Sequence, residues 1–154
     1  ARAVLPSMIA RGEGYFVQMA SAAGLLSQIG DAAYSASKHA AVGFAESLSI
    51  THGDDGIKVS VICPQYVATP MLGYDTGEGI DQYSGVISPE QVADAVIQGI
   101  DTEQFLILPH ADVEQFIQFK AANYDRWLGS MRKLRRKIIN EVGSTQLSEM
   151  HKLV

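Results

Sequence analysis

A tyrosine and a lysine four residues apart, Tyr34 and Lys38, carry the most distinctive chemistry in this sequence. Side chains at positions i and i+4 lie on one face of a helix, so the phenol and the ammonium are expected to be neighbours. A neutral phenol is a poor general base because its ordinary pKa is about 10. A nearby ammonium favours the phenolate, and such a pair could exchange a proton with a substrate. Ser21, upstream of both, could hold the substrate oxygen by a hydrogen bond.

The same spacing also has a purely structural interpretation. Many tyrosine–lysine pairs consist of a half-buried ring and a lysine whose methylenes lie along apolar surface while the ammonium stays in water. The Tyr-x-x-x-Lys pattern is therefore weak on its own. The catalytic interpretation depends on the elements that surround the pair.

Those elements are a predicted strand, a long helix and a second strand. Residues 15–20 are rich in aromatic and apolar side chains, residues 33–52 have helical composition, and residues 57–63 are β-branched and end at a proline. Within the helix, Ala41, Ala45 and Leu48 share a stripe with Tyr34 at the helical period. The face that bears the phenol and the ammonium is therefore expected to continue into the core, with Lys38 at its edge.

The alternation of strands and helices continues beyond the second strand. Residues 65–87 are expected to form a long loop, a candidate functional lid. Ser88 begins a helix with a proline at its first position and a capping box, and residues 104–109 predict a third strand. Right-handed crossovers then give a parallel sheet covered on both faces, in which the strand at 15–20 should be central. We interpret this α/β architecture as one half of a doubly wound sheet.

Residues 111–154 are expected to form a C-terminal helical extension that packs on the domain or on a partner. Asp112 is expected to cap its first helix, and a more basic helix is expected from about Met131. The first of these helices is expected to carry four large aromatic residues, Phe116, Phe119, Tyr124 and Trp127. Its basic cluster, residues 132–137, is interpreted as a solvated helix face, with contact to acidic lipid or a neighbouring subunit as the other reading.

The composition excludes several classes of protein. With 154 residues, the chain is long enough for one domain, and its net charge of −5 argues against a nucleic-acid partner. The single cysteine, Cys63, excludes an internal disulfide and fits a reducing compartment, so a cytoplasmic location is expected. No stretch approaches the roughly 20 apolar residues of a membrane span. The four histidines are scattered without ligand spacing, so no metal site is expected.

Five short motifs, read in order, resemble the short-chain dehydrogenase/reductase family over residues 1 to about 72. They are Leu-Pro-Ser-Met at 5–8, Gly-x-Gly at 12–14, Ser-Ala-Ala-Gly at 21–24, Tyr-Ser-Ala-Ser-Lys-His-Ala-Ala-Val at 34–42, and Val-Ile-Cys-Pro at 61–64 followed by Val-Ala-Thr-Pro at 67–70. The resemblance implies that residues 1–110 are the C-terminal part of a Rossmann-type domain. It is fainter up to residue 109, and residues 111–154 lie outside it.

The resemblance also implies roles for the residues that match the family's motifs. Tyr34 matches the catalytic acid/base, Lys38 the partner that also binds the nicotinamide ribose, and Ser21 the substrate-orienting hydroxyl. Three further residues match the nicotinamide site: Pro64, Val67 and Thr69. Of these, Val67 and Thr69 match the positions that hold the carboxamide. The implied activity of the parent protein is NAD- or NADP-dependent interconversion of an alcohol and a ketone or aldehyde. The implied assembly is a homodimer or homotetramer.

The substrate is expected to be a small apolar molecule. Four side chains of the predicted loop either line a hydrophobic substrate pocket or seal the loop against the sheet: Met71, Leu72, Tyr74 and Tyr83. Gln65 stands where the family usually has a glycine, which allows the backbone to approach the nicotinamide ring. The contact with the cofactor is therefore expected to be reshaped at Gln65. On the predicted strand at 15–20, Gln18 stands where the family commonly has an asparagine.

The family's glycine-rich Thr-Gly-x-x-x-Gly-x-Gly turn, which binds the pyrophosphate, does not occur in these 154 residues. Only the nicotinamide side of the cofactor site is therefore expected in this chain, and we interpret the chain as a fragment. The alternative to the catalytic hypothesis is a non-catalytic fragment or oligomerising half-domain that cannot bind a dinucleotide by itself.

Overall fold

The computed structural model describes residues 1–74, 83 and 85–153. Its central feature is a parallel sheet in the order β1–β2–β5, formed by β1 (Gly14–Met19), β2 (Ile57–Ile62) and β5 (Leu106–Ile107). β1 pairs with β2 along its whole length, whereas β5 pairs only with the last two residues of β2. Within the described residues β2 is thus the middle strand and β1 lies at an edge, so the prediction of a central β1 is not met in this sheet.

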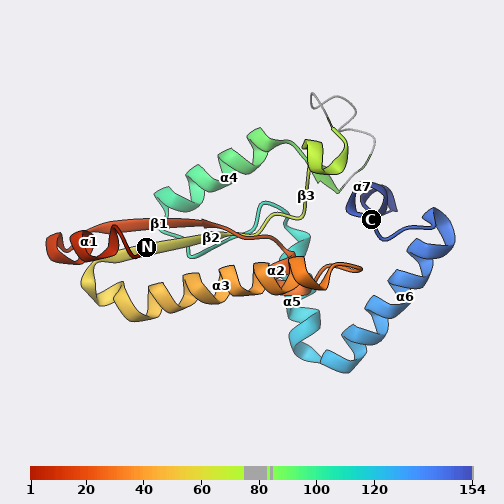
Figure 1. Ribbon diagram of the computed structural model, residues 1–154, viewed down its shortest axis with the longest axis horizontal. Coiled ribbons are helices and arrows are strands. Elements are labelled where there is room, and N and C mark those ends of the chain that lie inside the picture. Colours follow the sequence, from red (N-terminus) through yellow and green to blue (C-terminus); the bar gives the residue numbers. More distant parts are fainter. Residues whose placement is uncertain (75–82, 84, 154) are drawn as a thin grey trace.

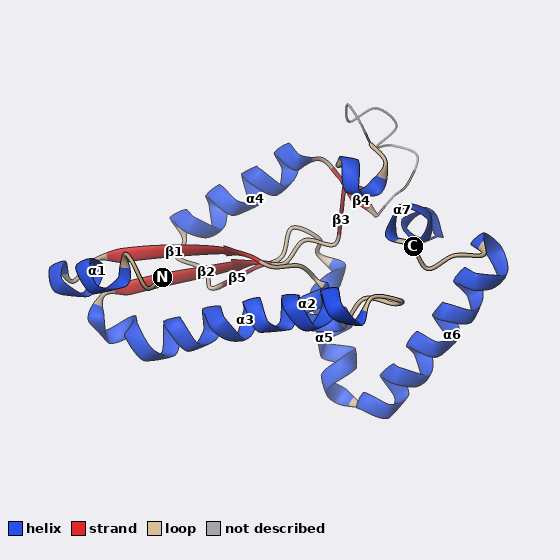
Figure 2. Ribbon diagram, viewed as in Figure 1, coloured by secondary structure: helices blue, strands red, loops and turns tan. Residues whose placement is uncertain are grey.

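Helices cover both faces of this sheet. Helix α3 (Ala32–His52) connects β1 to β2 and lies along one face, and α4 (Pro89–Asp101) lies across the other (Figures 1 and 2). The short helix α1 (Leu5–Arg11) precedes β1, and α2 (Ala23–Leu26) follows it. This arrangement confirms the predicted doubly wound parallel α/β fold.

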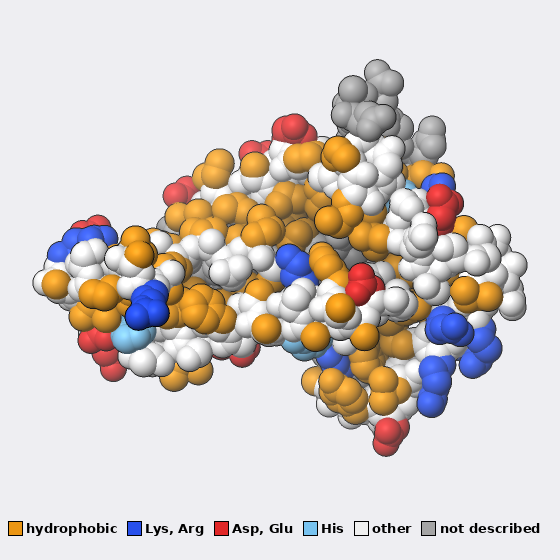
Figure 3. All heavy atoms as spheres, viewed as in Figure 1, with side chains coloured by type: hydrophobic (Ala, Val, Ile, Leu, Met, Phe, Trp, Pro, Cys, Tyr) orange, Lys and Arg blue, Asp and Glu red, His pale blue; other side chains and the backbone are white. Residues whose placement is uncertain are grey.

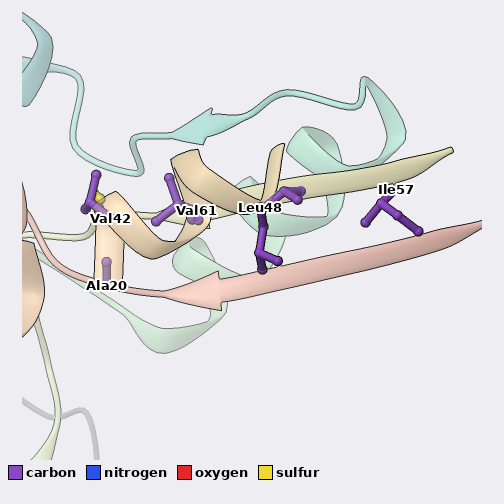
Figure 4. Close-up of a cluster of buried hydrophobic side chains, with 8 residues drawn as sticks. Ala20, Val42, Leu48, Ile57 and Val61 are labelled. Atoms are coloured by element: carbon purple, nitrogen blue, oxygen red, sulfur yellow. The ribbon is translucent and has the colours of Figure 1, made fainter. Parts of the chain in front are cut away.

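The main core lies between α3 and the sheet. Ala45 and Val61 are fully buried, and Val42 and Leu48 of α3 lie beside Ile57 and Val61 of β2 (Figure 4). The predicted stripe of α3 therefore does face the sheet. Each fully buried aliphatic side chain of this size contributes about 1.5–3 kcal/mol. The core thus fixes α3, and with it the residues of its first turns, relative to the carboxyl ends of the strands.

The start of α4 agrees with the sequence pattern. The Ser88 hydroxyl accepts a hydrogen bond from the Gln91 N–H at 3.2 Å, and the Gln91 side chain accepts one from the Ser88 N–H at 2.8 Å. This reciprocal pair is the predicted capping box. Val92 of α4 packs against Ile62 and Ile107 and forms the core on the second face of the sheet.

The predicted loop at 65–87 contains regular structure. A second small parallel sheet pairs β3 (Tyr66–Val67) with β4 (Val86–Ile87), and Pro70–Leu72 form a 3₁₀ turn. Strands of two residues give no readable period in a sequence, which is why the loop prediction is wrong here. Tyr66, Ala68, Leu72 and Val86 are buried together as a separate small core. Residues 75–82 and 84 of the predicted loop lie outside the described residues.

The C-terminal region consists of α5 (Asp112–Ala122), α6 (Tyr124–Val142), α7 (Leu147–Met150) and a last 3₁₀ turn, His151–Leu153. Two predictions about it are wrong. Ala111, not Asp112, occupies the N-cap of α5, without a side-chain cap. The basic helix begins at Tyr124 instead of about Met131, because Asn123 adopts extended backbone and its side chain accepts the Arg126 N–H at 2.9 Å.

Helix α6 turns sharply away from α5 (Figure 1). Its inner side buries Trp127 and Ile138, whereas its lysines and arginines gather on the outer side, as the space-filling view shows (Figure 3). The cluster at 132–137 is thus a solvated face in this chain, as predicted. Across the described residues, no helix combines the length and apolar character needed to cross a membrane.

Candidate active site

Ser21 lies at the point where β1 ends. Only 8% of its surface is exposed, and its hydroxyl accepts the Ala23 N–H at 3.1 Å. The same hydroxyl donates to the Pro64 carbonyl at 3.4 Å, a long hydrogen bond that joins the ends of the neighbouring strands β1 and β2. Because that bond is weak, a ligand oxygen could replace the Pro64 carbonyl as the acceptor of the Ser21 hydrogen bond.

Tyr34 and Lys38 occupy the first two turns of α3. Asp31 caps this helix by accepting the Tyr34 N–H at 2.8 Å, so the helix begins just before the phenol. Both side chains are half-buried, and the Lys38 ammonium lies over the Tyr34 ring, 5.4 Å from its centroid. The Tyr34 and Lys38 side chains are therefore neighbours, as predicted, and the ammonium lies over the face of the ring.

A close backbone contact fixes α2 against α3 at the level of Lys38. Gly24 of α2 faces the Lys38 carbonyl, and an ideal Cβ at position 24 would lie 2.6 Å from that oxygen. Only glycine fits there without displacing a helix. Since Ser21 comes directly before α2, this contact sets the spacing between Ser21 and the Tyr34–Lys38 pair.

The segment after β2 carries the three residues that match the nicotinamide site. Pro64 is half-buried at the end of the strand, and the Thr69 hydroxyl donates to the Val67 carbonyl at 3.3 Å. Gln65, in place of the usual glycine, is not among the described non-glycine residues with positive φ, which are Ser27 and Glu103. Its side chain is therefore accommodated without backbone strain.

His110 holds this segment and was not found by sequence reasoning. Its Nδ1 accepts the Gln65 N–H at 3.1 Å, and its Nε2–H donates to the Tyr66 carbonyl at 3.0 Å. A backbone N–H can only donate and a carbonyl can only accept, so the imidazole is the neutral Nε2–H tautomer. Burial lowers the pKa of His110, and its bond to the Tyr66 carbonyl opposes this only in part. No local motif could have revealed the contact, since its partners are more than forty residues away.

A single cavity of about 970 Å³ brings all the predicted site residues together. The residues of the predicted site that line it are Ser21, Tyr34, Lys38, Pro64, Val67 and Thr69. They come from the end of β1, the start of α3 and the segment after β2. The carboxyl ends of parallel strands are where doubly wound folds bind ligands.

Cys63 lies directly behind this site and has no reactive character. It is fully buried at the end of β2. Burial raises the pKa of its thiol to about 11, although the Ser21 backbone and the Lys38 charge act in the opposite direction. Cys63 is thus an inert core residue.

His39 and the loop side chains surround the site in different ways. His39 points its Nδ1–H at the Ser35 carbonyl at 2.9 Å. Met71 and Leu72 line the cavity, whereas Tyr74 and Tyr83 pack against the ring of His151, in the last 3₁₀ turn. Within the described residues, no group of three or more His, Cys, Asp or Glu side chains comes together in a way that could hold a metal ion.

The fold and the site define a doubly wound α/β protein with a Ser–Tyr–Lys group at the carboxyl ends of its strands. Residues 1–78 match the family model described as short chain dehydrogenase. This chain belongs to the short-chain dehydrogenase family.

Proteins of known name and solved structures agree with this assignment. The chain is 40% identical over 100 residues to oxidoreductase UcpA of Escherichia coli K12, a match that covers 64% of this chain and 36% of that protein. It is 35% identical over 112 residues to human epidermal retinol dehydrogenase 2, covering 70% and 36%. It is also similar to a short-chain dehydrogenase/reductase from Burkholderia phymatum, solved in complex with NAD, at a TM-score of 0.66 and 25% identity over 80% of this chain and 53% of that one. The chain thus spans about a third of the length of the named relatives that it matches.

Proposed function

We propose that this chain carries the proton-transfer site of an NAD- or NADP-dependent oxidoreductase that interconverts an alcohol and a ketone or aldehyde. Tyr34 is the acid/base, Lys38 is the cation that favours the phenolate, and Ser21 orients the substrate oxygen. The observation that carries the proposal is the shared cavity, in which a serine from a strand end and a tyrosine with a lysine on its ring face the same space.

The chemistry of these groups accounts for one half of the reaction. In the oxidative direction the Ser21 hydroxyl donates to the alcohol oxygen, and the Tyr34 phenolate removes the hydroxyl proton. The electron pair of the O–H bond forms the second C–O bond while a hydride leaves the carbinol carbon. Bound NAD or NADP supplies the acceptor for that hydride. In the reductive direction Tyr34 returns its proton to the carbonyl oxygen.

The segment after β2 fits a nicotinamide ring. The Thr69 hydroxyl already donates to the Val67 carbonyl, so its lone pairs are left to accept from a carboxamide N–H. Pro64 and Val67 add apolar surface to the same cavity. His110 hydrogen-bonds the Gln65 N–H and the Tyr66 carbonyl, which keeps this wall in place. The complex of the Burkholderia relative with NAD supports this choice of cofactor class.

The substrate that fits this cavity is an apolar small-molecule alcohol or carbonyl compound. Aliphatic and aromatic side chains make up most of the wall, and Lys38 is the only charged residue among the described lining residues. The name of the human relative, a retinol dehydrogenase, agrees with an apolar alcohol.

The test is NAD(P)H-linked turnover by the protein that the full reading frame of this chain encodes. Tyr34→Phe keeps the ring but removes the hydroxyl, and turnover is expected to fall by a factor of about 10²–10⁴ or more. Tyr124→Phe is the matched control, because Tyr124 lies on α6, is 56% exposed and does not line the cavity. Turnover by Tyr34→Phe at the rate of the control would overturn the proposal.

A second proposal concerns the 154-residue chain by itself. It contains no glycine-rich pyrophosphate turn, so we propose that it does not bind a dinucleotide tightly. Titration of NADH fluorescence tests this, and saturable binding by this chain would contradict it.

We also propose that the protein is a cytoplasmic homodimer or homotetramer. The resemblance to the family is the ground for this assembly, and light scattering would measure its mass.

A further inference from the structure

Half of the lysines and arginines of this chain lie on one helix. Six of the twelve belong to α6, and five of these fall at positions 132–137. The chain as a whole has a net charge of −5, so the concentration of positive charge is local. In the space-filling view these side chains form a group along α6, at the edge of the molecule (Figure 3). This helix therefore presents an electrostatic surface unlike that of the rest of the chain.

The inner side of α6 is already occupied, which fixes the direction of its outer side. Trp127 and Ile138 are buried, and both line the cavity together with residues of α5 and α7. Trp127 also packs on Lys120 of α5, whose ammonium lies 4.8 Å from the ring centroid and donates to the Leu25 carbonyl of α2 at 2.5 Å. The helix is thus held to the domain by its apolar side, and its outer side needs no folding step to meet a partner.

Apolar side chains lie among the cations on the outer side of α6. Two exposed aliphatic residues and two exposed arginines recur at spacings of four, three and four positions, which places them in one stripe along the helix: Leu128, Arg132, Arg135 and Ile139. Leu128 is 42% exposed and Ile139 is 37% exposed. These four residues and Arg136, one turn beyond Arg132 on the neighbouring row, are called here the outer face. It combines positive charge with exposed apolar surface.

The arginines of the outer face are available to an anion. Within residues 1–74, 83 and 85–153, no lysine or arginine of α6 lies within ion-pair distance of an acidic side chain. On the outer side of α6 the only acidic residue is Asp125, which lies in the first turn, two turns before Arg132. The charge of the outer face is therefore not neutralised by its own helix.

We propose that the outer face binds the surface of a membrane that contains anionic phospholipids, with the axis of α6 parallel to the membrane plane. Clustered lysines and arginines on a helix are attracted by anionic headgroups, and long arginine side chains reach those headgroups while neighbouring apolar side chains enter the interface. Nucleic acid would match the cations, but its phosphates offer nothing to Leu128 and Ile139. These two residues lie about 16 Å apart along a single helix, which suits a planar surface. The proposal does not rest on the proposed function.

Co-sedimentation of the full-length protein with lipid vesicles tests the proposal. One set of vesicles contains phosphatidylserine and phosphatidylcholine in equal amounts, and the other contains phosphatidylcholine alone. We expect binding to the anionic vesicles to be at least roughly tenfold tighter at about 0.1 M salt. Most of this difference should disappear at about 1 M salt, because the Debye length falls from about 10 Å to about 3 Å.

Two double substitutions separate the outer face from the total charge of the protein. Arg132→Gln with Arg136→Gln removes two charges from the outer face, whereas Arg2→Gln with Arg11→Gln removes two exposed charges at and before α1. Each lost headgroup contact should weaken binding about fivefold, so the outer-face variant should lose about 25-fold on anionic vesicles and the control less than about twofold.

A second pair of variants tests the apolar part of the outer face. Ile139→Ser should weaken binding to anionic vesicles about fivefold, because an aliphatic side chain no longer enters the interface. Ile50→Ser is the matched control, since Ile50 lies on α3 and is 85% exposed, and it should change binding less than about twofold. All the substituted residues are exposed, and far-ultraviolet circular dichroism checks that each variant folds.

Equal binding to the two kinds of vesicle, or equal losses in the two arginine variants, would overturn the proposal. A DNA duplex of random sequence bound as tightly as the anionic vesicles would assign the outer face to nucleic acid instead. A lower oligomer mass of the Arg132→Gln, Arg136→Gln variant in light scattering would assign it to a subunit interface, and either result also overturns the proposal. No turnover is measured, so the outcome is separate from that of the proposed function.

Discussion

Replacing Gly24 with alanine tests the contact that sets the spacing of the site. The new Cβ would lie 2.6 Å from the Lys38 carbonyl oxygen and 3.0 Å from a methyl group of Val42. Ordinary contact begins at 3.4 Å, so α2 would have to move from α3 by the difference, about 0.8 Å. Overpacking against backbone costs about 1–3 kcal/mol. In a chain of this size each kcal/mol lowers Tm by about 2–4 °C.

Gly43→Ala is the matched control for this substitution. Gly43 lies in α3, in the turn after Lys38, and its Cβ position is open space. Alanine is favoured over glycine within a helix by about 1 kcal/mol, so this variant should be more stable than the parent chain. Urea unfolding followed by circular dichroism should therefore separate the two variants by about 2–4 kcal/mol. Equal free energies of unfolding for the two variants would refute the reasoning about the Gly24 contact.

Two titratable groups give further predictions. Burial lowers the pKa of His110, so as pH falls below about 6.5 the unfolded chain binds more protons than the folded one and stability should decrease. Urea midpoints at pH 7 and pH 5 should show a smaller decrease in His110→Gln, and an identical decrease in both proteins would contradict this. Burial raises the pKa of Cys63 to about 11, so iodoacetamide at pH 8 should label it slowly in the native chain and rapidly in urea. Rapid labelling of the native chain would show that Cys63 is not buried.

The elements that sequence reasoning predicted well are those with a long, regular pattern. The α3 stripe and the β-branched run of β2 have periods that are readable over many residues, and the Ser88 capping box is a local signal. The division between α5 and α6 had such a signal too, since Asn123 is a good N-cap residue, but the run of aromatic residues across it suggested one helix.

The parts that could not be predicted depend on contacts between distant residues. His110 is recognised only when Gln65 and Tyr66 are seen beside it. Lys120 is separated from Leu25 by 95 positions, so nothing near it in sequence indicates that the C-terminal helices form a wall of the cavity. The residues of the predicted site were found because their motif is local, whereas the surface that surrounds a ligand is assembled by the tertiary fold.

The central claim is that Tyr34 transfers the proton while other surfaces bind the ligand. The most direct test measures binding and turnover on one sample of Tyr34→Phe, made in the full-length protein. Trp127 lines the cavity, so tryptophan fluorescence reports the binding of an alcohol such as 1-octanol. We expect this titration to give a Kd within about twofold of the parent protein, since one hydroxyl among many contacts is lost, and NAD(P)H-linked turnover to fall by at least about 10². Turnover that falls only in proportion to weakened binding would contradict the claim, because Tyr34 would then be a binding residue and not the acid/base.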